Sequence, residues 1–296
     1  MTVKQAFENF IFAKQIQGCS AKTIKCYRDF CSSFIKFIGL DTDISTLNND
    51  LYNKYIKSLY ERTLSQSTRA TYITHFKSFV HWVSNEYGLD LQYEKIKVPK
   101  TAKKIVRIYN SNEIKQIFAS VTTDEEWITV RNKCIIALML DCGLRQNEVC
   151  TISRENINSL DATIKVTGKG NKERIVPLGI VTQQLMAAYD KLCPYKEDFF
   201  FATHNGDRLT TNAVKQFMRK IARKLSFPFS SHKLRHNFAT NYCLNHYEQF
   251  GKVDIYSLML LMGHEKVETT RGYLHFAQQI IATKTSISHL DKVLIS

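Results

Sequence analysis

The sequence contains no apolar run close to the roughly 18 residues that a membrane-spanning helix needs. Its opening segment, MTVKQAFENFIFAKQ, carries a polar or charged side chain every few positions and therefore lacks the apolar core of a secretory signal. We expect a cytoplasmic protein with no membrane partner.

Patterns typical of metal and nucleotide sites are also missing. The eight cysteines include no C-x-x-C pair, which predicts reduced, mostly buried thiols and argues against a zinc site or a disulfide framework. His232 and His236 have the spacing of the H-E-x-x-H motif, but the position that requires Glu is Lys233. The glycines of TGKGNK do not have the spacing of a P-loop. We expect neither a metal nor a cofactor.

Acidic side chains are scarce relative to basic ones. Lys and Arg number 41 against 27 Asp and Glu, which gives a formal net charge of +14 and a pI near 9.3. The excess occurs both in residues 1–100 and in the remainder, so it is not a charged tail. This balance favours a polyanionic partner such as nucleic acid, although charge alone leaves a solvated basic surface as an equal alternative.

The length of 296 residues is typical of two domains. In residues 21–38 apolar side chains recur every three or four positions, which predicts an amphipathic helix with a core-facing stripe. A second helix is expected to begin at Ser67 as its N-cap and to end at Gly88. We therefore expect residues 1–93 to form an all-helical domain. The stripe of the first helix consists of Ile24, Tyr27, Cys31, Phe34 and Ile38.

The apolar periodicity fades between Gly88 and Asn110, and a linker is expected at residues 94–110, where Pro99 and several lysines occur. We expect a basic linker in which each lysine neutralises a DNA phosphate and releases counterions. An ordinary solvated linker is the alternative. The lysines concerned are Lys95, Lys97, Lys100, Lys103 and Lys104.

Residues 111–296 are expected to form a second domain that is mainly helical with a small antiparallel β-sheet. A helix opens at 111–113, and the apolar segment 131–144 predicts a buried helix that ends at Gly143. Two short strands, 163–167 and 173–178, predict a hairpin with Lys169 at its tip. Further helices are expected at 210–225 and from His232 onward.

Polar residues of this second domain together suit the cleavage of a phosphodiester. The transition state gathers negative charge on the nonbridging oxygens, and the guanidinium groups of Arg145 and Arg235 match phosphate geometry. His264 would add a further donor, and His232 would accept or donate a proton. Lys169 would protonate the departing 5′ oxygen, and Tyr273 would be the nucleophile.

Four segments of the chain resemble motifs of the tyrosine recombinases, also called phage integrases. They are GLRQNEV (143–149), TGKGNKERIVPL (167–178), HKLRH (232–236) and MGHEKVETTRGY (262–273). The resemblance implies a site-specific recombinase that cleaves and rejoins DNA through a covalent 3′-phosphotyrosine, without metal or ATP. It implies Glu148 as a supporting residue and six catalytic residues, namely Arg145, Lys169, His232, Arg235, His264 and Tyr273.

The resemblance also implies how the molecule is organised on DNA. Residues 1–93 would be a helical, SAM-like core-binding domain, residues 111–296 the catalytic domain, and the two together a clamp around the duplex. The partners would be double-stranded recombination sites, two of them held by a homotetramer or by a heterotetramer with a related recombinase. Helical spacing at Ile287, Leu290 and Leu294 predicts a short amphipathic tail that docks on its own domain or on a neighbouring subunit.

Two other functions remain as alternatives. A noncatalytic DNA-binding protein on the same scaffold would keep the clamp without the chemistry, but the retention of every reactive group argues against it. A type IB topoisomerase would use the same chemistry to relax supercoils, and it would need no paired sites. The sequence does not distinguish chromosome-dimer resolution from integration or excision of a mobile element, because the target site is not readable from it.

Overall fold

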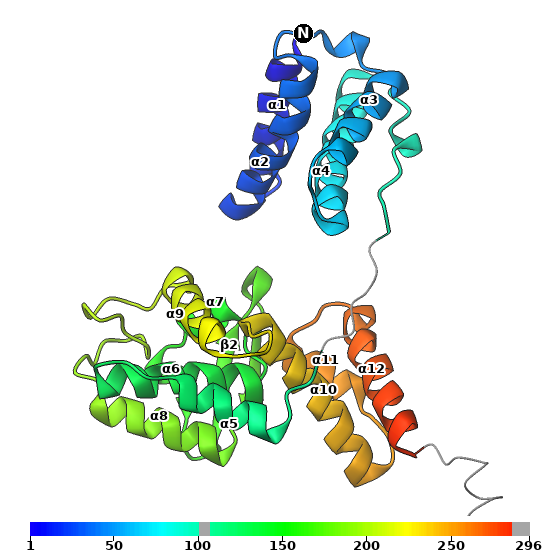
Figure 1. Ribbon diagram of the computed structural model, residues 1–296. Coiled ribbons are helices and arrows are strands. Elements are labelled where there is room, and N and C mark those ends of the chain that lie inside the picture. The colour runs from blue at the N-terminus through cyan, green and yellow to red at the C-terminus, as the bar shows by residue number, and fades with distance from the viewer. Residues whose placement is uncertain (101–106, 286–296) are drawn as a thin grey trace, which may run out of the picture. The chain divides into compact units, whose positions relative to one another are not determined.

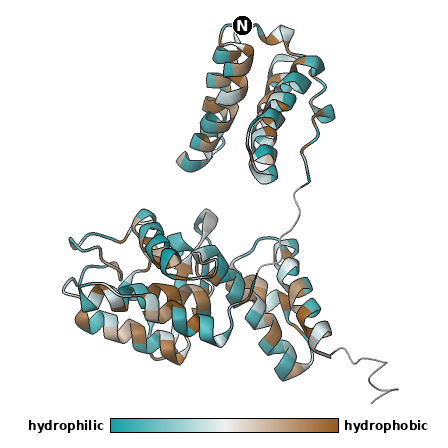
Figure 2. Cartoon of the chain, in the orientation of Figure 1, coloured by the Kyte–Doolittle hydropathy of each residue, from teal (hydrophilic) through white to brown (hydrophobic). Residues whose placement is uncertain are grey.

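The computed structural model describes residues 1–100 and 107–285, and the chain divides into two compact units, Met1–Lys104 and Ile105–Ser296 (Figure 1). The division falls between the domain boundaries expected at residues 93 and 111. In both units the helices turn apolar faces inward and hydrophilic faces outward (Figure 2). No helix among the described residues combines the length and the apolar character needed to cross a membrane.

The first unit contains four α-helices, as the all-helical prediction required. They are α1 (Val3–Ile16), α2 (Ala21–Ile38), α3 (Asn49–Glu61) and α4 (Gln66–Tyr87). Two 3-10 turns, η1 (Ile44–Thr46) and η2 (Tyr93–Lys95), complete it. The stripe predicted for α2 faces the core, where Cys31 and Phe34 are fully buried. Aromatic rings dominate this core; Phe34, for example, lies 4.4 Å from Phe76 and 5.1 Å from Tyr55 between ring centroids.

The predicted N-cap of α4 was wrong by two residues. The cap is Ser65, whose hydroxyl accepts from the backbone N–H of Thr68 at 3.1 Å, and Ser67 lies inside the first turn. The predicted end is confirmed, because Gly88 adopts the left-handed conformation (φ 63°) that terminates the helix. The chain beyond it stays attached to the first unit as far as Ile96, which is buried in the same core.

The second unit is mainly helical with a three-stranded antiparallel sheet in the order β1-β2-β3, which confirms the predicted fold class. Its strands are β1 (Ile157–Asn158), β2 (Thr163–Thr167) and β3 (Glu173–Pro177). Its helices are α5 (Ser111–Ser120), α6 (Glu126–Asp141), α7 (Gln146–Cys150), α8 (Ile180–Leu192), α9 (Thr211–Lys224), α10 (Ser231–Phe250), α11 (Ile255–Met262) and α12 (Val267–Thr285), and short 3-10 turns are η3 (Arg154–Asn156) and η4 (Lys169–Asn171). The predicted hairpin is confirmed, whereas the two-residue strand β1 was not anticipated.

The buried helix predicted at 131–144 is α6, which begins earlier and ends earlier than expected. After α6 the chain turns sharply at Gly143, where φ is 65°. A Cβ atom at this position would lie 2.3 Å from Cδ1 of Phe238, so only glycine fits both the conformation and the space. The turn brings Arg145 to the start of α7, and α7 is the first element of the candidate site.

A small apolar cluster joins α10, α11 and α12 and supports the rest of the site. Its buried members come from all three helices, and Tyr273 packs against it. These three helices lie together at one side of the second unit (Figure 1). The buried members are Ala239, Cys243, Leu258, Met262 and Ala277.

Candidate active site

Arg145 is the N-cap residue of α7 and is held by a carboxylate one turn further along. Its backbone N–H donates to Oε2 of Glu148 at 2.7 Å, and its guanidinium donates to Oε1 at 2.7 Å. The other terminal nitrogen donates to the carbonyl of Gly263 at 3.2 Å. Because 36% of the Arg145 side chain is exposed, the guanidinium is fixed in direction and still accessible to an anion.

Arg174 on β3 is a member of the site that the sequence interpretation missed. Its two terminal nitrogens each donate to one oxygen of Glu148 at 2.9 Å, and its Nε donates to the carbonyl of Leu261 at 2.7 Å. Burial of Glu148 opposes ionisation, but the bonds from Arg174 and Arg145 outweigh it and lower the pKa of Glu148 to about 2. The buried carboxylate is therefore an anion that orients two arginines.

Arg235 projects from the first turns of α10 into the same cluster. It donates to the carbonyls of Gly143 and Met262, and it lies 3.9 Å from Oε2 of Glu148. Burial and the nearby charge of Arg145 lower the pKa of Arg235 to about 10, so the group stays protonated at neutral pH. Three guanidinium groups thus surround one carboxylate, and the excess positive charge suits a phosphate.

His264 follows Gly263 in the turn between α11 and α12. Its Nε2 lies 3.3 Å from a guanidinium nitrogen of Arg235, and its Nδ1 lies 2.9 Å from Oγ1 of Thr270. Burial, together with the charge of Arg235, lowers the pKa of His264 to about 4, so the ring is neutral. Since Arg235 only donates, Nε2 accepts and Nδ1–H donates to Thr270. Thr270 is a second contributor that sequence reasoning missed.

His232 and His236 lie one turn apart on α10 and contact each other directly. The two Nε2 atoms are 2.7 Å apart, and the ring planes are nearly perpendicular at 87°. Burial and neighbouring positive charges lower the pKa of both rings, in the case of His236 to about 4. The sequence interpretation selected His232 for chemistry and assigned His236 no role.

Tyr273 lies on α12 against the rings of two of these histidines. Its ring is nearly parallel to that of His264, with an interplanar angle of 13° and centroids 6.1 Å apart, and it lies 5.0 Å from the ring of His236. Burial raises the pKa of Tyr273, while the charges of Arg235 and Arg145 act in the opposite direction. The structure therefore brings together five of the six predicted residues, namely Arg145, His232, Arg235, His264 and Tyr273.

The sixth predicted residue, Lys169, begins the 3-10 turn between β2 and β3, and its side chain lies outside the described part of the chain. The hairpin itself is linked to the site, because Lys172 donates to Glu265 at 2.9 Å. Of the linker lysines, Lys95, Lys97 and Lys100 are exposed, whereas Lys103 and Lys104 lie outside the described residues. The predicted tail with Ile287, Leu290 and Leu294 also lies outside them.

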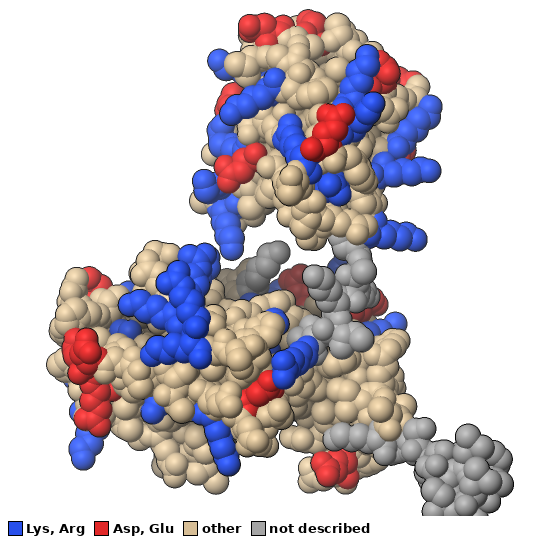
Figure 3. Space-filling view, in the orientation of Figure 1, with Lys and Arg blue, Asp and Glu red and all other residues tan. Residues whose placement is uncertain are grey.

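Basic side chains gather over α9, as Figure 3 shows. The helix buries Val214, Met218 and Ile221 on one side, which leaves its basic residues on the solvent side. This exposed row can neutralise several phosphates of a polyanion. We call it the α9 basic face; it consists of Lys215, Arg219, Lys220, Arg223 and Lys224.

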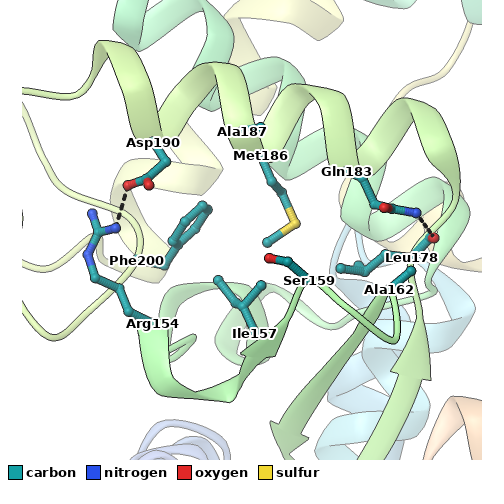
Figure 4. Close-up of a pocket in the computed structure, with 10 residues that line it drawn as sticks. All are labelled: Arg154, Ile157, Ser159, Ala162, Leu178, Gln183, Met186, Ala187, Asp190 and Phe200. Atoms are coloured by element: carbon teal, nitrogen blue, oxygen red, sulfur yellow. Dashed lines mark hydrogen bonds and ion pairs between the residues drawn. The ribbon is translucent and has the colours of Figure 1, made fainter.

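A cavity of about 400 Å³ lies elsewhere in the second unit, between α8 and the end of the sheet (Figure 4). Its walls are largely apolar, with Met186 and Phe200 opposite Ile157. The ion pair between Arg154 and Asp190 closes one end. None of the predicted site residues lines this cavity, so the candidate site is the open cluster around Glu148. Among residues 1–100 and 107–285 there is no group of three or more His, Cys, Asp or Glu that could hold a metal ion.

Known proteins resemble this chain along most of its length. Tyrosine recombinase XerD of Listeria innocua serovar 6a is 27% identical over 282 residues, which cover 91% of this chain and 92% of that protein. Tyrosine recombinase XerC of Pediococcus pentosaceus is 27% identical over 274 residues, covering 88% and 89%.

Solved structures share the fold at lower sequence identity. A lambda integrase (75–356) dimer bound to a COC′ core site has a TM-score of 0.73 at 15% identity and covers 93% of this chain and 95% of that one. XerH recombinase in a post-cleavage complex with a palindromic difH substrate has a TM-score of 0.71 at 21% identity, covering 93% and 82%. The family model described as "Phage integrase family" matches residues 107–279, which include the whole described site. The chain belongs to the phage integrase family.

Proposed function

We propose that this protein is a site-specific tyrosine recombinase that cleaves and rejoins double-stranded DNA through a covalent 3′-phosphotyrosine. The observation that carries the proposal is that Tyr273 lies beside a cluster of three arginines that surround one buried carboxylate, Glu148. The named relatives XerD and XerC, which match along nine-tenths of their length, support site-specific recombination. Chromosome-dimer resolution and mobile-element integration or excision are both compatible with this assignment.

The arginines stabilise the charge that develops on the phosphate. Arg145 and Arg235 donate to the nonbridging oxygens of the scissile phosphate, and their direction is set beforehand by Glu148 and by backbone carbonyls. Fixed donors need no reorganisation during the reaction, and losing one typically costs about 100- to 1,000-fold in rate. Glu148 and Arg174 act on this step by holding Arg145, without touching the DNA.

The covalent step exchanges one phosphate ester for another. The phenol oxygen of Tyr273 releases its proton to solvent water and bonds to phosphorus, while the bond from phosphorus to the 5′ oxygen breaks and that oxygen takes up a proton. Lys169 at the hairpin tip supplies this proton, and His232 contributes a proton-transfer or hydrogen-bonding group. Attack by a 5′ hydroxyl of the partner strand reverses the sequence, so no ATP is consumed.

The DNA partner is a pair of recombination sites held by a tetramer of this chain, or of this chain and a related recombinase. The α9 basic face and the exposed lysines at residues 95, 97 and 100 provide sequence-independent phosphate contacts. The two units correspond in this proposal to a core-binding domain and a catalytic domain that enclose the duplex.

A nicked suicide substrate tests the chemistry. Incubated with DNA carrying a nick next to the scissile phosphate, the protein should form a covalent adduct that survives denaturation and that Tyr273→Phe abolishes. A noncatalytic DNA-binding protein gives only salt-sensitive binding, and a type IB topoisomerase relaxes supercoiled plasmids that carry a single site. Sequencing the DNA attached to Tyr273 in cells identifies the target. The proposal would be refuted if no DNA were recovered covalently attached to Tyr273 in cells and no nicked substrate formed an adduct.

A further inference from the structure

The contact between His232 and His236 restricts where the ring protons lie. Residues four apart on a helix face the same side, and here the two Nε2 atoms approach to 2.7 Å. Both rings are neutral near pH 7, because burial lowers both pKa values. A neutral imidazole has one N–H and one bare nitrogen, so a single proton lies between the two Nε2 atoms. One histidine donates and the other accepts.

The surroundings of His236 decide which ring donates. Its Nδ1 is buried and has no hydrogen-bond partner among the residues that the structure describes. If the proton were on Nδ1, a buried N–H would be left unpaired, which is rarer in proteins than a buried acceptor left unpaired. The proton of His236 therefore belongs on Nε2, where it donates to Nε2 of His232. His232 must then carry its own proton on Nδ1.

We propose that His236 is a positioning residue that holds His232 as the Nδ1–H tautomer. In this state His232, whose side chain is exposed, presents an N–H donor and has its other nitrogen occupied. A donor suits a nonbridging oxygen of the scissile phosphate, whereas a base for Tyr273 would need a bare, accessible nitrogen. This inference rests on the proposed function, and it assigns His232 to the phosphate and not to the removal of the Tyr273 proton.

His236 also has a second point of contact with the reacting groups. Its ring lies 5.0 Å from that of Tyr273, so the same side chain touches the phosphate-binding histidine and the nucleophile. Burial lowers the pKa of both rings most, and the charge of Arg235, which directly precedes His236 on α10, lowers both further; for His236 the neighbouring His232 adds to this. A neutral hydrogen-bond donor at position 236 avoids a further positive charge in this crowded region.

Nitrogen NMR of the full-length chain tests the tautomer without reference to activity. The protein is labelled with 15N-histidine, and the ring signals of His232 are assigned by their loss in His232→Gln. The Nδ1–H and Nε2–H tautomers differ in which ring nitrogen has the pyrrole-type shift. The expected result is Nδ1–H for His232 in the unaltered chain and in His236→Gln, whose amide can still donate. In His236→Phe the signal should move toward the Nε2–H form that free histidine prefers.

The matched control is His246→Phe, the same substitution on the same helix. His246 lies ten residues further along α10, about 15 Å away, and its Nδ1 contacts the carbonyl of Lys252. This variant should leave the His232 signals unchanged. An Nε2–H tautomer of His232 in the unaltered chain would overturn the inference, as would an unchanged Nδ1–H tautomer in His236→Phe.

Cleavage of the nicked substrate supplies a second readout. We expect His236→Phe to slow adduct formation by about 10- to 100-fold, the loss typical when a group that orients a metal-bound histidine is removed. His236→Gln should keep most of the rate. A shifted tautomer with an unchanged rate would refute the positioning role while leaving the recombinase assignment intact. Absence of an adduct in the unaltered chain would instead refute the assignment, whatever the tautomer.

Discussion

Each unit of the molecule contains an arginine whose two terminal nitrogens donate to the two carboxylate oxygens of a glutamate. One of these pairs is exposed to solvent and the other is buried. In the first unit Arg28 donates to the two oxygens of Glu8 at 3.0 Å, and both side chains are about half exposed. In the second unit Arg174 donates to the two oxygens of Glu148 at 2.9 Å, and both are nearly buried. The geometry is the same, so the difference lies in the cost of removing the charges from water.

This contrast extends to the two cores. Among the described residues, every buried side chain with a strong polar or charged group other than the tyrosines lies in the second unit, including Glu113, Arg131, Glu148 and Arg235. The core of the first unit is apolar and aromatic. Buried charges are costly unless they are paired. For Glu148 and Arg235 the proposed phosphate site accounts for that cost. Glu113 and Arg131 lie outside this site, and each is paired with neighbouring polar groups, Glu113 with Asn110 and Arg107 and Arg131 with Asn132 and the carbonyl of Ala202.

The largest expected difference between the two glutamate pairs is in stability. Arg174→Met leaves the buried charge of Glu148 paired with Arg145 but without its two hydrogen bonds from Arg174. The free energy of unfolding of the second unit should therefore fall by about 3–5 kcal/mol. Arg28→Met should change that of the first unit by less than about 1 kcal/mol. The two tryptophans, Trp82 and Trp127, report on one unit each, so urea unfolding is followed by fluorescence in Trp127→Phe or Trp82→Phe backgrounds.

A second substitution sharpens the result for the buried pair. The double variant Glu148→Gln, Arg174→Gln removes both charges. Its loss of unfolding free energy should be smaller than the sum of the losses in the two single variants. Equal effects of Arg174→Met and Arg28→Met would show that burial does not govern the strength of these pairs.

The next expected effect is on the reaction. Arg145→Ala should slow both cleavage and religation of the nicked substrate by about 100- to 1,000-fold, because it removes a preoriented donor to the phosphate. DNA affinity should fall only modestly, as measured by titration at fixed salt. Arg154→Ala is the matched control, since Arg154 pairs with Asp190 beside the cavity of Figure 4. A comparable loss of rate in that variant would mean that the effect of Arg145→Ala is structural.

Sequence patterns predicted the residues proposed to touch the substrate better than the residues that hold them in place. Arg145, Arg235 and Tyr273 occur in segments whose order identifies them. Arg174 was missed because a lone arginine in a strand is usually exposed. The signal was nevertheless present: side chains alternate along a strand, so Arg174 shares the inward face of β3 with Val176, which is buried, while Ile175 is 65% exposed.

Helix ends were harder to predict than helix faces, because an end depends on one residue whereas a face depends on several. The segment LSQST at the start of α4 offers three hydroxyl residues, each able to cap, and the structure selects Ser65, whose hydroxyl accepts from the backbone N–H of Thr68. The apolar stripe of α2, in contrast, was predicted correctly because several residues share one periodicity. Contacts between segments far apart in the sequence, such as that of Arg174 with the carbonyl of Leu261, have no local sequence pattern that predicts them.

Acid should weaken the second unit through Glu148. Its pKa falls from an ordinary 4.5 to about 2 on folding, so its stabilising contribution is complete above about pH 4.5 and is lost as the pH falls toward 2. The loss from this one group is about 3 kcal/mol. Unfolding is measured between pH 6 and 2.5 with Trp127 as the probe, where the unaltered chain should show a steeper decline than Glu148→Gln. Parallel curves would exclude Glu148 as the source.

The smallest expected effect is on stability, and it differs in sign between the two cores: removing a buried tyrosine hydroxyl should stabilise the first unit and destabilise the second. Tyr52 is buried in the first unit, and its hydroxyl has no hydrogen-bond partner among the described residues. Tyr109 is buried in the second unit, and its hydroxyl donates to the carbonyl of Pro228 at 3.0 Å. A buried hydroxyl that is unpaired costs free energy, whereas a paired one contributes about 1 kcal/mol.

Tyr52→Phe should therefore stabilise the first unit by about 1 kcal/mol, measured with Trp82, while Tyr109→Phe should destabilise the second by a similar amount, measured with Trp127. Destabilisation by Tyr52→Phe would mean that its hydroxyl has a partner, such as an ordered water, and that the first core is less purely apolar than its side chains indicate.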